Sequence, residues 1–242
     1  MAEKIVIFGA TGGMGSAAAA RLDAAGYSLH LVARDESQLI TMASELGADW
    51  TAGDARDESL FSQVADEAGD GLAGLVYAIG TLNLKGLNRL TADEMRQDFE
   101  VNALGAALAV QYLAPALRKN DRPASVVLFS SVAAEQGFKM HTSMGMAKGA
   151  VRGLTLSLAA ELGPKVRVNA ISPSLTRTSM AEGMLGNEKL AEAIGKMHAM
   201  ERLGTAEDMA ALVEFLISEQ SSWITGQIIG VDGGRSTLRI KS

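Results

Sequence analysis

The 242-residue sequence contains no cysteine, which excludes disulfide bridges, thiolate metal sites and thiol-based catalysis. Only 4 residues are proline and 5% are aromatic, so the core must consist mainly of Ala, Leu, Val and Ile. There is no basic excess, because 22 Lys and Arg stand against 28 Asp and Glu, and the net charge is −6. This balance argues against a sequence-independent nucleic-acid binder. We expect no nucleic-acid partner and no metal ion.

Long uninterrupted apolar runs are also missing. The most apolar helical stretch, 101–117, contains Asn102, Gln111 and Pro115, and is too short and too interrupted to span a bilayer. The first strand is predicted to begin by Lys4 or Ile5, which leaves no room for a signal peptide. We therefore expect a cytoplasmic protein with no membrane partner.

The hydrophobic residues, 48% of the chain, follow a repeating pattern in which short β-branched runs alternate with longer helical periods. This pattern predicts repeated βαβ units. We expect an α/β protein with one domain over 1–242, a Rossmann fold whose doubly wound, parallel, seven-stranded sheet has helices on both faces. Strands are predicted at 5–8, 29–33, 49–51, 74–77, 125–129, 166–171 and 227–231. Helices are predicted near 14–25, 35–46, 57–68, 91–118, 142–162 and 206–217.

The segment 174–200 is long and weakly patterned, and it carries Met180, Met184, Met197 and Met200. A long irregular insertion in a compact α/β domain is usually a lid or binding loop. The alternative is a pair of helices that cap the sheet, with methionine filling gaps. The pattern favours a substrate-binding lid.

A glycine-rich loop follows the first predicted strand and opens a helix, with Gly9, Gly13 and Gly15 in the spacing G-x3-G-x-G. Glycines at such a loop let the backbone amides approach a pyrophosphate at the positive end of the helix. The alternative is a purely structural turn. In this strand–loop–helix setting the loop predicts a dinucleotide site.

The end of the second predicted strand indicates which dinucleotide is bound. An NAD site usually has a carboxylate there, but this sequence has Ala33 followed by Arg34. A guanidinium can pair with the 2′-phosphate of NADP, whereas Asp35 is expected to cap the next helix. We predict that NADPH is preferred over NADH.

Further motifs follow in order along the chain. They are Gly53-Asp54-Ala55, Tyr77-Ala-Ile-Gly80, Val101-Asn102-Ala103, Arg167-Val-Asn-Ala-Ile-Ser-Pro173 and Ile224-Thr-Gly-Gln with Val231-Asp-Gly-Gly234. In these motifs and spacings the chain resembles the short-chain dehydrogenase/reductase family over nearly its whole length. The resemblance implies an NAD(P)-dependent oxidoreductase in which Asp54 contacts the adenine, Asn102 supports a water-linked proton relay and Thr178 lies near the nicotinamide amide. The cofactor-binding residues that it implies are Gly9, Thr11, Gly13, Met14, Gly15, Arg34, Asp54, Ala55, Ala78, Gly80, Lys148, Pro173, Thr176 and Thr178.

The predicted active-site helix departs from this family. Its members keep Y-x3-K, with a serine thirteen residues before the tyrosine. Lys148 is present here, but the position four residues before it is Met144, and the position thirteen residues before that is Ser131. A thioether has no proton to give and accepts hydrogen bonds weakly, so Met144 cannot replace a tyrosine. The resemblance leaves Ser131, Lys148 and Asn102 in catalytic positions and gives Lys148 the ribose hydroxyls to bind.

His141 is a candidate for the missing group. His141-Thr-Ser-Met-Gly-Met-Ala-Lys148 is similar to the Y-x6-K of divergent enoyl-thioester reductases, with His141 in the place of the tyrosine. We expect His141 to precede the helix N-cap, with Thr142 or Ser143 as the cap. A neutral histidine there can donate one N–H to a carbonyl or enolate oxygen. The alternative is an exposed histidine without a role.

Structural alternatives stay open for the other candidates. Ser131 can cap a strand end, Asn102 can bond to helix backbone, and Lys148 can be a solvated surface lysine. Two functions follow from these readings. One is NADP(H)-dependent hydride transfer to or from a small, apolar carbonyl or enoyl compound. The other is a catalytically inactive dinucleotide-binding sensor or partner subunit. Small residues along helices 91–118 and 142–162 favour a homo-oligomer, a dimer or tetramer, since the family commonly pairs these helices.

Overall fold

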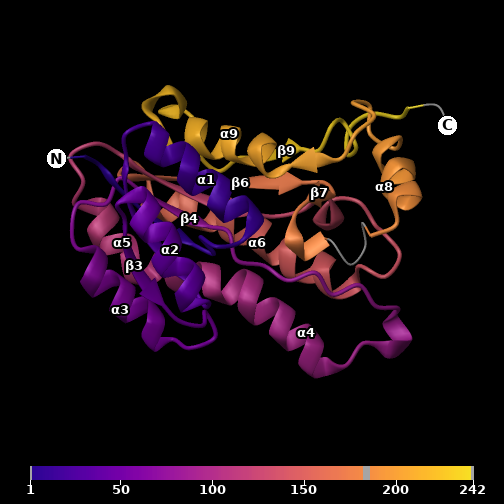
Figure 1. The fold of residues 1–242 in the computed structure, drawn as a ribbon, viewed down its shortest axis with the longest axis horizontal. Coiled ribbons are helices and arrows are strands. Elements are labelled where there is room, and N and C mark those ends of the chain that lie inside the picture. The colour runs from indigo at the N-terminus through magenta and orange to yellow at the C-terminus, as the bar shows by residue number, and fades with distance from the viewer. Residues whose placement is uncertain (1, 182–185, 241–242) are drawn as a thin grey trace.

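The computed structural model describes residues 2–181 and 186–240, and it contains the predicted seven-stranded sheet (Figure 1). The strand order is β3-β2-β1-β4-β5-β6-β9, and every neighbouring pair is parallel. The strands are β1 Lys4–Phe8, β2 Ser28–Ala33, β3 Asp49–Ala52, β4 Gly74–Tyr77, β5 Ala124–Phe129, β6 Val166–Pro173 and β9 Ile228–Val231. The order reverses between β1 and β4. In open α/β sheets, ligands bind beyond the carboxyl ends of the strands at such a reversal.

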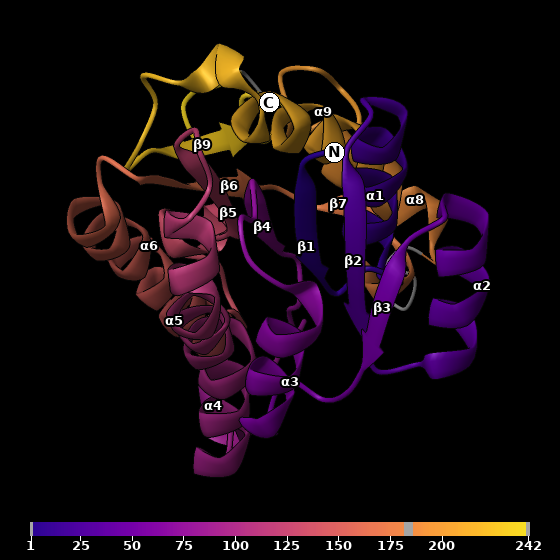
Figure 2. The ribbon, with the colours of Figure 1, turned by 90° about the vertical axis from the view of Figure 1, so that its left-hand side faces the viewer.

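Helices cover both faces of the sheet, which confirms the predicted fold (Figure 2). Helices α1 Gly13–Ala24, α2 Glu36–Leu46 and α9 Ala206–Ile217 pack on one face. Helices α3 Ser59–Ala68, α5 Gly105–Arg118 and α6 Thr142–Leu162 pack on the other. The sequence of β1 is a continuous apolar run because both faces of the strand are buried. Ile5 and Ile7 pack under α1, α2 and α9, and Val6 and Phe8 pack under α3, α5 and α6.

The predicted helix 91–118 is interrupted in the structure. Helix α4, Ala92–Phe99, ends in a widened π-type turn over Glu100–Leu104 before α5 begins, and the N–H of Gly105 reaches back five residues to the carbonyl of Glu100. Within this stretch the side-chain Nδ2 of Asn102 donates to the carbonyl oxygen of Asp98 at 2.8 Å. Such π-turns occur frequently at functional sites.

The segment predicted as a lid is partly regular. Strand β7 Thr176–Arg177 pairs with β8 Gly204–Thr205, and helix α8 Glu188–Gly195 follows, capped by the side chain of Asn187. Helix α8 agrees in part with the alternative of helices in this segment, and the lid stays a prediction. Residues 182–185, which include Met184, lie outside the described residues. Among the helices of 2–181 and 186–240, none combines the length and apolar character needed to cross a membrane.

Candidate active site

Glycine positions in the loop between β1 and α1 have no room for a side chain. Gly9 has φ +80°, and a Cβ there would lie 2.9 Å from the carbonyl carbon of Ala78. A Cβ on Gly15 would lie 2.1 Å from the carbonyl oxygen of Gly9. Gly12, which the sequence motif did not single out, is the exposed N-cap of α1. The loop therefore presents bare backbone at the positive end of a helix, which fits a pyrophosphate.

Charged side chains follow β2 and β3 at the same edge of the sheet. Arg34 is exposed at the end of β2, and Asp35 caps α2 by accepting the N–H of Gln38 at 3.1 Å, as predicted. Asp54 follows β3 and accepts a hydrogen bond from Arg56, with 2.7 Å between Nη2 and Oδ2. This contact lowers the pKa of Asp54 to about 2. Arg56, which the sequence did not single out, is also exposed, and both Arg56 and Arg34 lower the pKa of Asp54.

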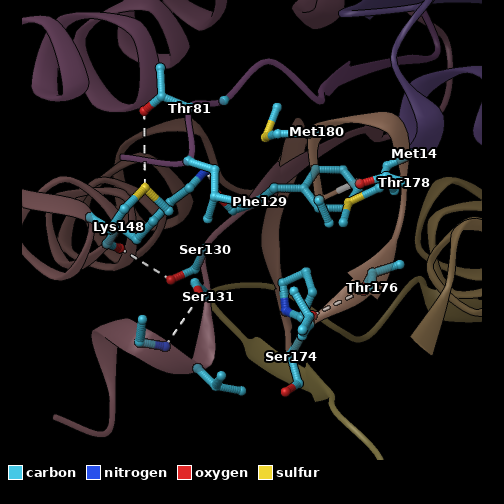
Figure 3. A pocket seen from close by; sticks show the side chains of 18 of the residues that line it. Met14, Thr81, Phe129, Ser130, Ser131, Lys148, Ser174, Thr176, Thr178 and Met180 are labelled. Atoms are coloured by element: carbon cyan, nitrogen blue, oxygen red, sulfur yellow. Dashed lines mark hydrogen bonds between the residues drawn. The ribbon is translucent and has the colours of Figure 1, made fainter. Parts of the chain in front are cut away.

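A cleft of about 340 Å³ opens at the carboxyl ends of β4, β5 and β6 (Figure 3). It brings together ten of the predicted site residues: Gly13, Met14, Ala78, Gly80, Ser131, His141, Lys148, Pro173, Thr176 and Thr178. The predicted residues outside its lining are Gly9, Thr11, Gly15, Arg34, Asp54, Ala55 and Asn102. Ala55 is buried in the core instead. The other walls are largely apolar, with Phe129, Phe138, Met144, Met180 and Met197.

Lys148 lies in the second turn of α6 with only 6% of its surface exposed. Its Nζ donates to the carbonyl oxygen of Phe129 at 2.8 Å, and burial lowers the pKa of Lys148 to about 8. A Cβ on Gly80 would lie 3.4 Å from this Nζ and 3.1 Å from Oδ1 of Asn102. That Oδ1 is buried and has no hydrogen-bond partner among the described residues. The glycine loop, the buried ammonium and this unpaired acceptor together fit a nicotinamide dinucleotide.

Ser131 caps a short helix, where the sequence had left open the cap of a strand end, and its catalytic role stays a prediction. Its Oγ accepts the N–H of Ala133 at 3.1 Å and so caps a short 3₁₀-helix, Val132–Ala134 (Figure 3). A hydroxyl that accepts one hydrogen bond keeps its proton for another partner. Ser131 also lines the cleft, so this proton is available to a substrate oxygen.

The sequence predicted that His141 precedes the N-cap of α6, but His141 is itself the N-cap. Its side chain makes no capping hydrogen bond. Ser143 does not cap because its hydroxyl turns inward and donates to Asp98. The Nδ1 of His141 lies 2.8 Å from the carbonyl oxygen of Lys139. In the neutral ring that contact places the proton on Nδ1, so Nε2 is an acceptor and donates only as imidazolium.

Met144 is 6% exposed, and its sulfur lies 4.0 Å from Oγ1 of Thr81 (Figure 3). Behind this contact lies a polar cluster around Asp98, which is 3% exposed. The hydroxyl of Thr81 donates to Oδ1 of Asp98 at 2.7 Å and accepts from Nδ2 of Asn102 at 2.8 Å. Asp98 also accepts from Ser143 and, at 3.3 Å, from Asn83. Sequence reasoning missed this cluster, although Asp98 and Asn102 share a helix face at a spacing of four residues.

Two more groups at the cleft were missed. His198 is buried after α8, and its Nε2 lies 2.8 Å from Oγ of Ser174, which joins the two ends of the segment 174–200. Arg235, in the segment after β9, holds its guanidinium 5.4 Å from the ring centre of Phe138. Gln136 fixes this segment by donating to the carbonyl of Ser236 at 2.6 Å. The sequence gives no local signal for the contacts of His198 and Arg235, because each contact joins segments that are far apart in the chain.

Comparisons with known proteins agree with this geometry. A family model described as enoyl-(acyl carrier protein) reductase matches residues 9–236. The L-2,3-butanediol dehydrogenase of Corynebacterium glutamicum is 31% identical, over 97% of this chain and 98% of its own. The short-chain reductase protein NovJ of Streptomyces niveus is 34% identical, over 95% of this chain and 92% of its own.

A solved structure of a short-chain type dehydrogenase/reductase from Mycobacterium ulcerans matches with a TM-score of 0.91 at 28% identity. The match covers 98% of this chain and 90% of that one. The similarity in sequence and in fold therefore extends over nearly the entire chain. The chain belongs to the short-chain dehydrogenase/reductase family and is an oxidoreductase of that type.

Proposed function

We propose that the protein transfers hydride between NADP(H) and a small, apolar carbonyl or enoyl compound, or the corresponding alcohol. One observation carries this proposal: a single cleft joins the dinucleotide loop, the buried Lys148 and the hydroxyl of Ser131 to a largely apolar wall. The names of the two relatives, a butanediol dehydrogenase and a short-chain reductase, support alcohol or carbonyl chemistry.

Different residues of the chain bind different parts of the dinucleotide. The amides at the start of α1 take the pyrophosphate, Arg34 and Arg56 face the 2′-phosphate, and the ammonium of Lys148 binds the nicotinamide ribose. When bound, the nicotinamide supplies or accepts the hydride. Ser131 donates a hydrogen bond to the substrate oxygen, while the apolar walls exclude water and orient the substrate.

The deciding experiment is a turnover screen with NADPH over ketones, quinones and enoyl thioesters, and with NADP⁺ over secondary alcohols. The proposal expects oxidation or reduction of at least one apolar member of this panel. The absence of the tyrosine hydroxyl at Met144 favours a second candidate, a dinucleotide-binding sensor or partner subunit without activity. NADPH binding with no turnover anywhere in the panel would select that second function.

We also propose that segment 174–200 acts as a substrate lid and that the protein forms a homo-oligomer in the cytoplasm. Leu175, Met180 and Met197 supply the lid's side of the cleft. The α4–α5 and α6 helices leave large apolar side chains uncovered, with Phe99 and Leu104 each 43% exposed and Leu156 53% exposed. A Cβ on Gly149 or Gly153 would meet nothing within 4 Å, so a second helix has room to approach closely.

A further inference from the structure

The carboxylate of Asp98 is buried beside Met144 without a counter-ion. The basic side chains on the elements around it are Arg96 of α4, His141, Lys148 and Arg152 of α6, and Lys85. Arg96 pairs with Asp93, Arg152 with Glu135 and Lys85 with Glu94. Among the described residues, none of these makes an ion pair with Asp98. A buried carboxylate is costly unless donors satisfy it. Thr81, Asn83 and Ser143 are the donors here.

The hydroxyl of Thr81 connects this carboxylate to the cleft. A hydroxyl has one proton and two lone pairs. The proton of Thr81 points to Asp98, and one lone pair accepts from Asn102. The amide of Asn102 is fixed in this orientation because the same Nδ2 also donates to the carbonyl oxygen of Asp98. Thr81 lines the cleft, and its second lone pair has no hydrogen-bond donor among the described residues.

We propose that Thr81 and Asp98 form a proton acceptor for a substrate hydroxyl, at the position where Met144 leaves no acid or base. The proposal rests on the function proposed above and adds the group that deprotonates the alcohol. Thr81 is the catalytic residue because it contacts the substrate. Asp98 acts through Thr81, and Asn102 positions the hydroxyl.

The step balances in atoms and electrons. The substrate O–H bond breaks and its proton moves to Oγ1 of Thr81, whose own proton passes along the 2.7 Å hydrogen bond to Oδ1 of Asp98. The carbinol carbon loses its hydrogen with both electrons to an oxidised nicotinamide dinucleotide as the C=O bond forms. Thr81 ends neutral, and Asp98 ends as the neutral acid.

The relay needs a different form of Asp98 in each direction. Oxidation of the alcohol requires the carboxylate form as the final proton acceptor, and reduction of the ketone requires the acid form as the proton source. Asp98→Asn keeps the size of the side chain and removes both forms, so it should lower kcat in both directions.

Kinetics of 2-octanol and 2,3-butanediol oxidation with NADP⁺ test the relay. Thr81→Val keeps the shape and removes the hydroxyl, and we expect its kcat to fall about a hundredfold or more, the usual scale for a lost acid or base. Thr81→Ser should stay within about tenfold of the wild type. Thr155→Val is the control, because Thr155 is a buried threonine whose hydroxyl donates to the carbonyl of Val151 within α6 and does not line the cleft.

Infrared difference spectra of the cofactor-free protein give a readout without turnover. The carboxylate band of Asp98 is assigned by subtraction of Asp98→Asn, and 2-octanol should shift it in the wild type and Thr81→Ser but not in Thr81→Val. An unshifted band in the wild type, or a Thr81→Val enzyme with unchanged kcat, would overturn the relay. A shifted band in a protein that oxidises neither alcohol supports the acceptor site and counts against the proposed oxidoreductase activity.

Discussion

At the scale of single residues, the resemblance to the family predicts one change in the chemistry of the site. Met144, which that resemblance aligns with the family's tyrosine, offers only a thioether against the hydroxyl of Thr81. Lys148, one helical turn further on, keeps a buried ammonium whose pKa burial lowers to about 8. The proposed function separates these two positions, since Lys148 binds the cofactor while Thr81 and Asp98 carry the proton.

Met144→Tyr is expected to raise the rate of 2-octanone reduction with NADPH. The new phenol would supply the missing acid, and general acids contribute about two to four orders of magnitude. Met144→Phe provides the same ring without the hydroxyl and serves as the control. Equal rates for the two variants would show that the vacancy at 144 does not limit the chemistry.

The affinity for NADPH should depend on pH through Lys148. Below about pH 8 the ammonium is charged and the dissociation constant should be flat, because the pKa of Lys148 lies near 8 in the cofactor-free protein. Above that pH, binding must also restore the proton, so the dissociation constant should rise by up to about tenfold per pH unit. Fluorescence titration from pH 6.5 to 9.5 measures this. A similar rise in Lys148→Met would assign the effect to another group.

Arg34→Ala should weaken NADPH binding by roughly tenfold or more and leave NADH binding unchanged. A hydrogen bond to a charged group contributes about 1.5–3 kcal/mol, and only NADPH has the 2′-phosphate. Arg21→Ala is the control, because Arg21 is another partly exposed arginine but pairs with Glu214 on the outer helices. Equal losses for both cofactors would place Arg34 elsewhere in the site.

At the scale of elements, the sequence predicted the regular parts well. The limits of α6 and α9 were predicted to the residue, and β4 likewise, because apolar periodicity and nearby breakers mark them. The π-turn after α4 was not predictable in this way. It depends on the side chain of Asn102 bonding to the carbonyl of Asp98, which periodicity does not encode.

The residues of the candidate site also fall into a predictable group and a group that the sequence did not reveal. Residues carried by local motifs, such as Gly13, Ser131 and Lys148, meet in one cleft. The cluster of Thr81, Asp98 and Ser143 was missed because it joins a loop and two helices, and the polar sequence of α4 reads as a solvated helix. Its buried carboxylate becomes visible only when α6 packs against α4.

The uncovered face of α6 predicts how copies of the chain associate. Leu156→Glu places a charge on this face, where Leu156 is 53% exposed, and should shift the oligomer toward the monomer in sedimentation velocity. Ile40→Glu is the matched control, since Ile40 is 47% exposed but lies on α2, on the opposite layer. The same shift in both variants, or in neither, would contradict an interface on α6.

At the scale of the whole molecule, the proposed cofactor site spans the sheet from β2 to β6, and the segment after β9 closes one side of the cleft. A ligand that contacts so many elements should stabilise all of them together. At a free NADPH concentration of 100 times its dissociation constant, binding adds about 2.7 kcal/mol to the free energy of unfolding.

For a chain of this length, that stabilisation corresponds to a rise in Tm of roughly 5–11 °C. Differential scanning calorimetry with and without NADPH measures it, and Gly15→Ala supplies the control. A Cβ on Gly15 would collide with the carbonyl oxygen of Gly9, so this variant should show little or no rise with NADPH. A full rise in Gly15→Ala would mean that the glycine loop is not where the dinucleotide binds.

The packing of α1 against α9 also sets when the protein can first become active during its own synthesis. Helix α1, whose N-terminus adjoins the glycine loop, leaves the ribosome before its neighbour α9 and before the strand β9 beside β6. Domains generally fold as units during translation. The nascent chain must therefore carry an incomplete form of the proposed dinucleotide site until β9 emerges. We expect NADPH in the medium to speed the last step of folding and to leave the earlier ones unchanged.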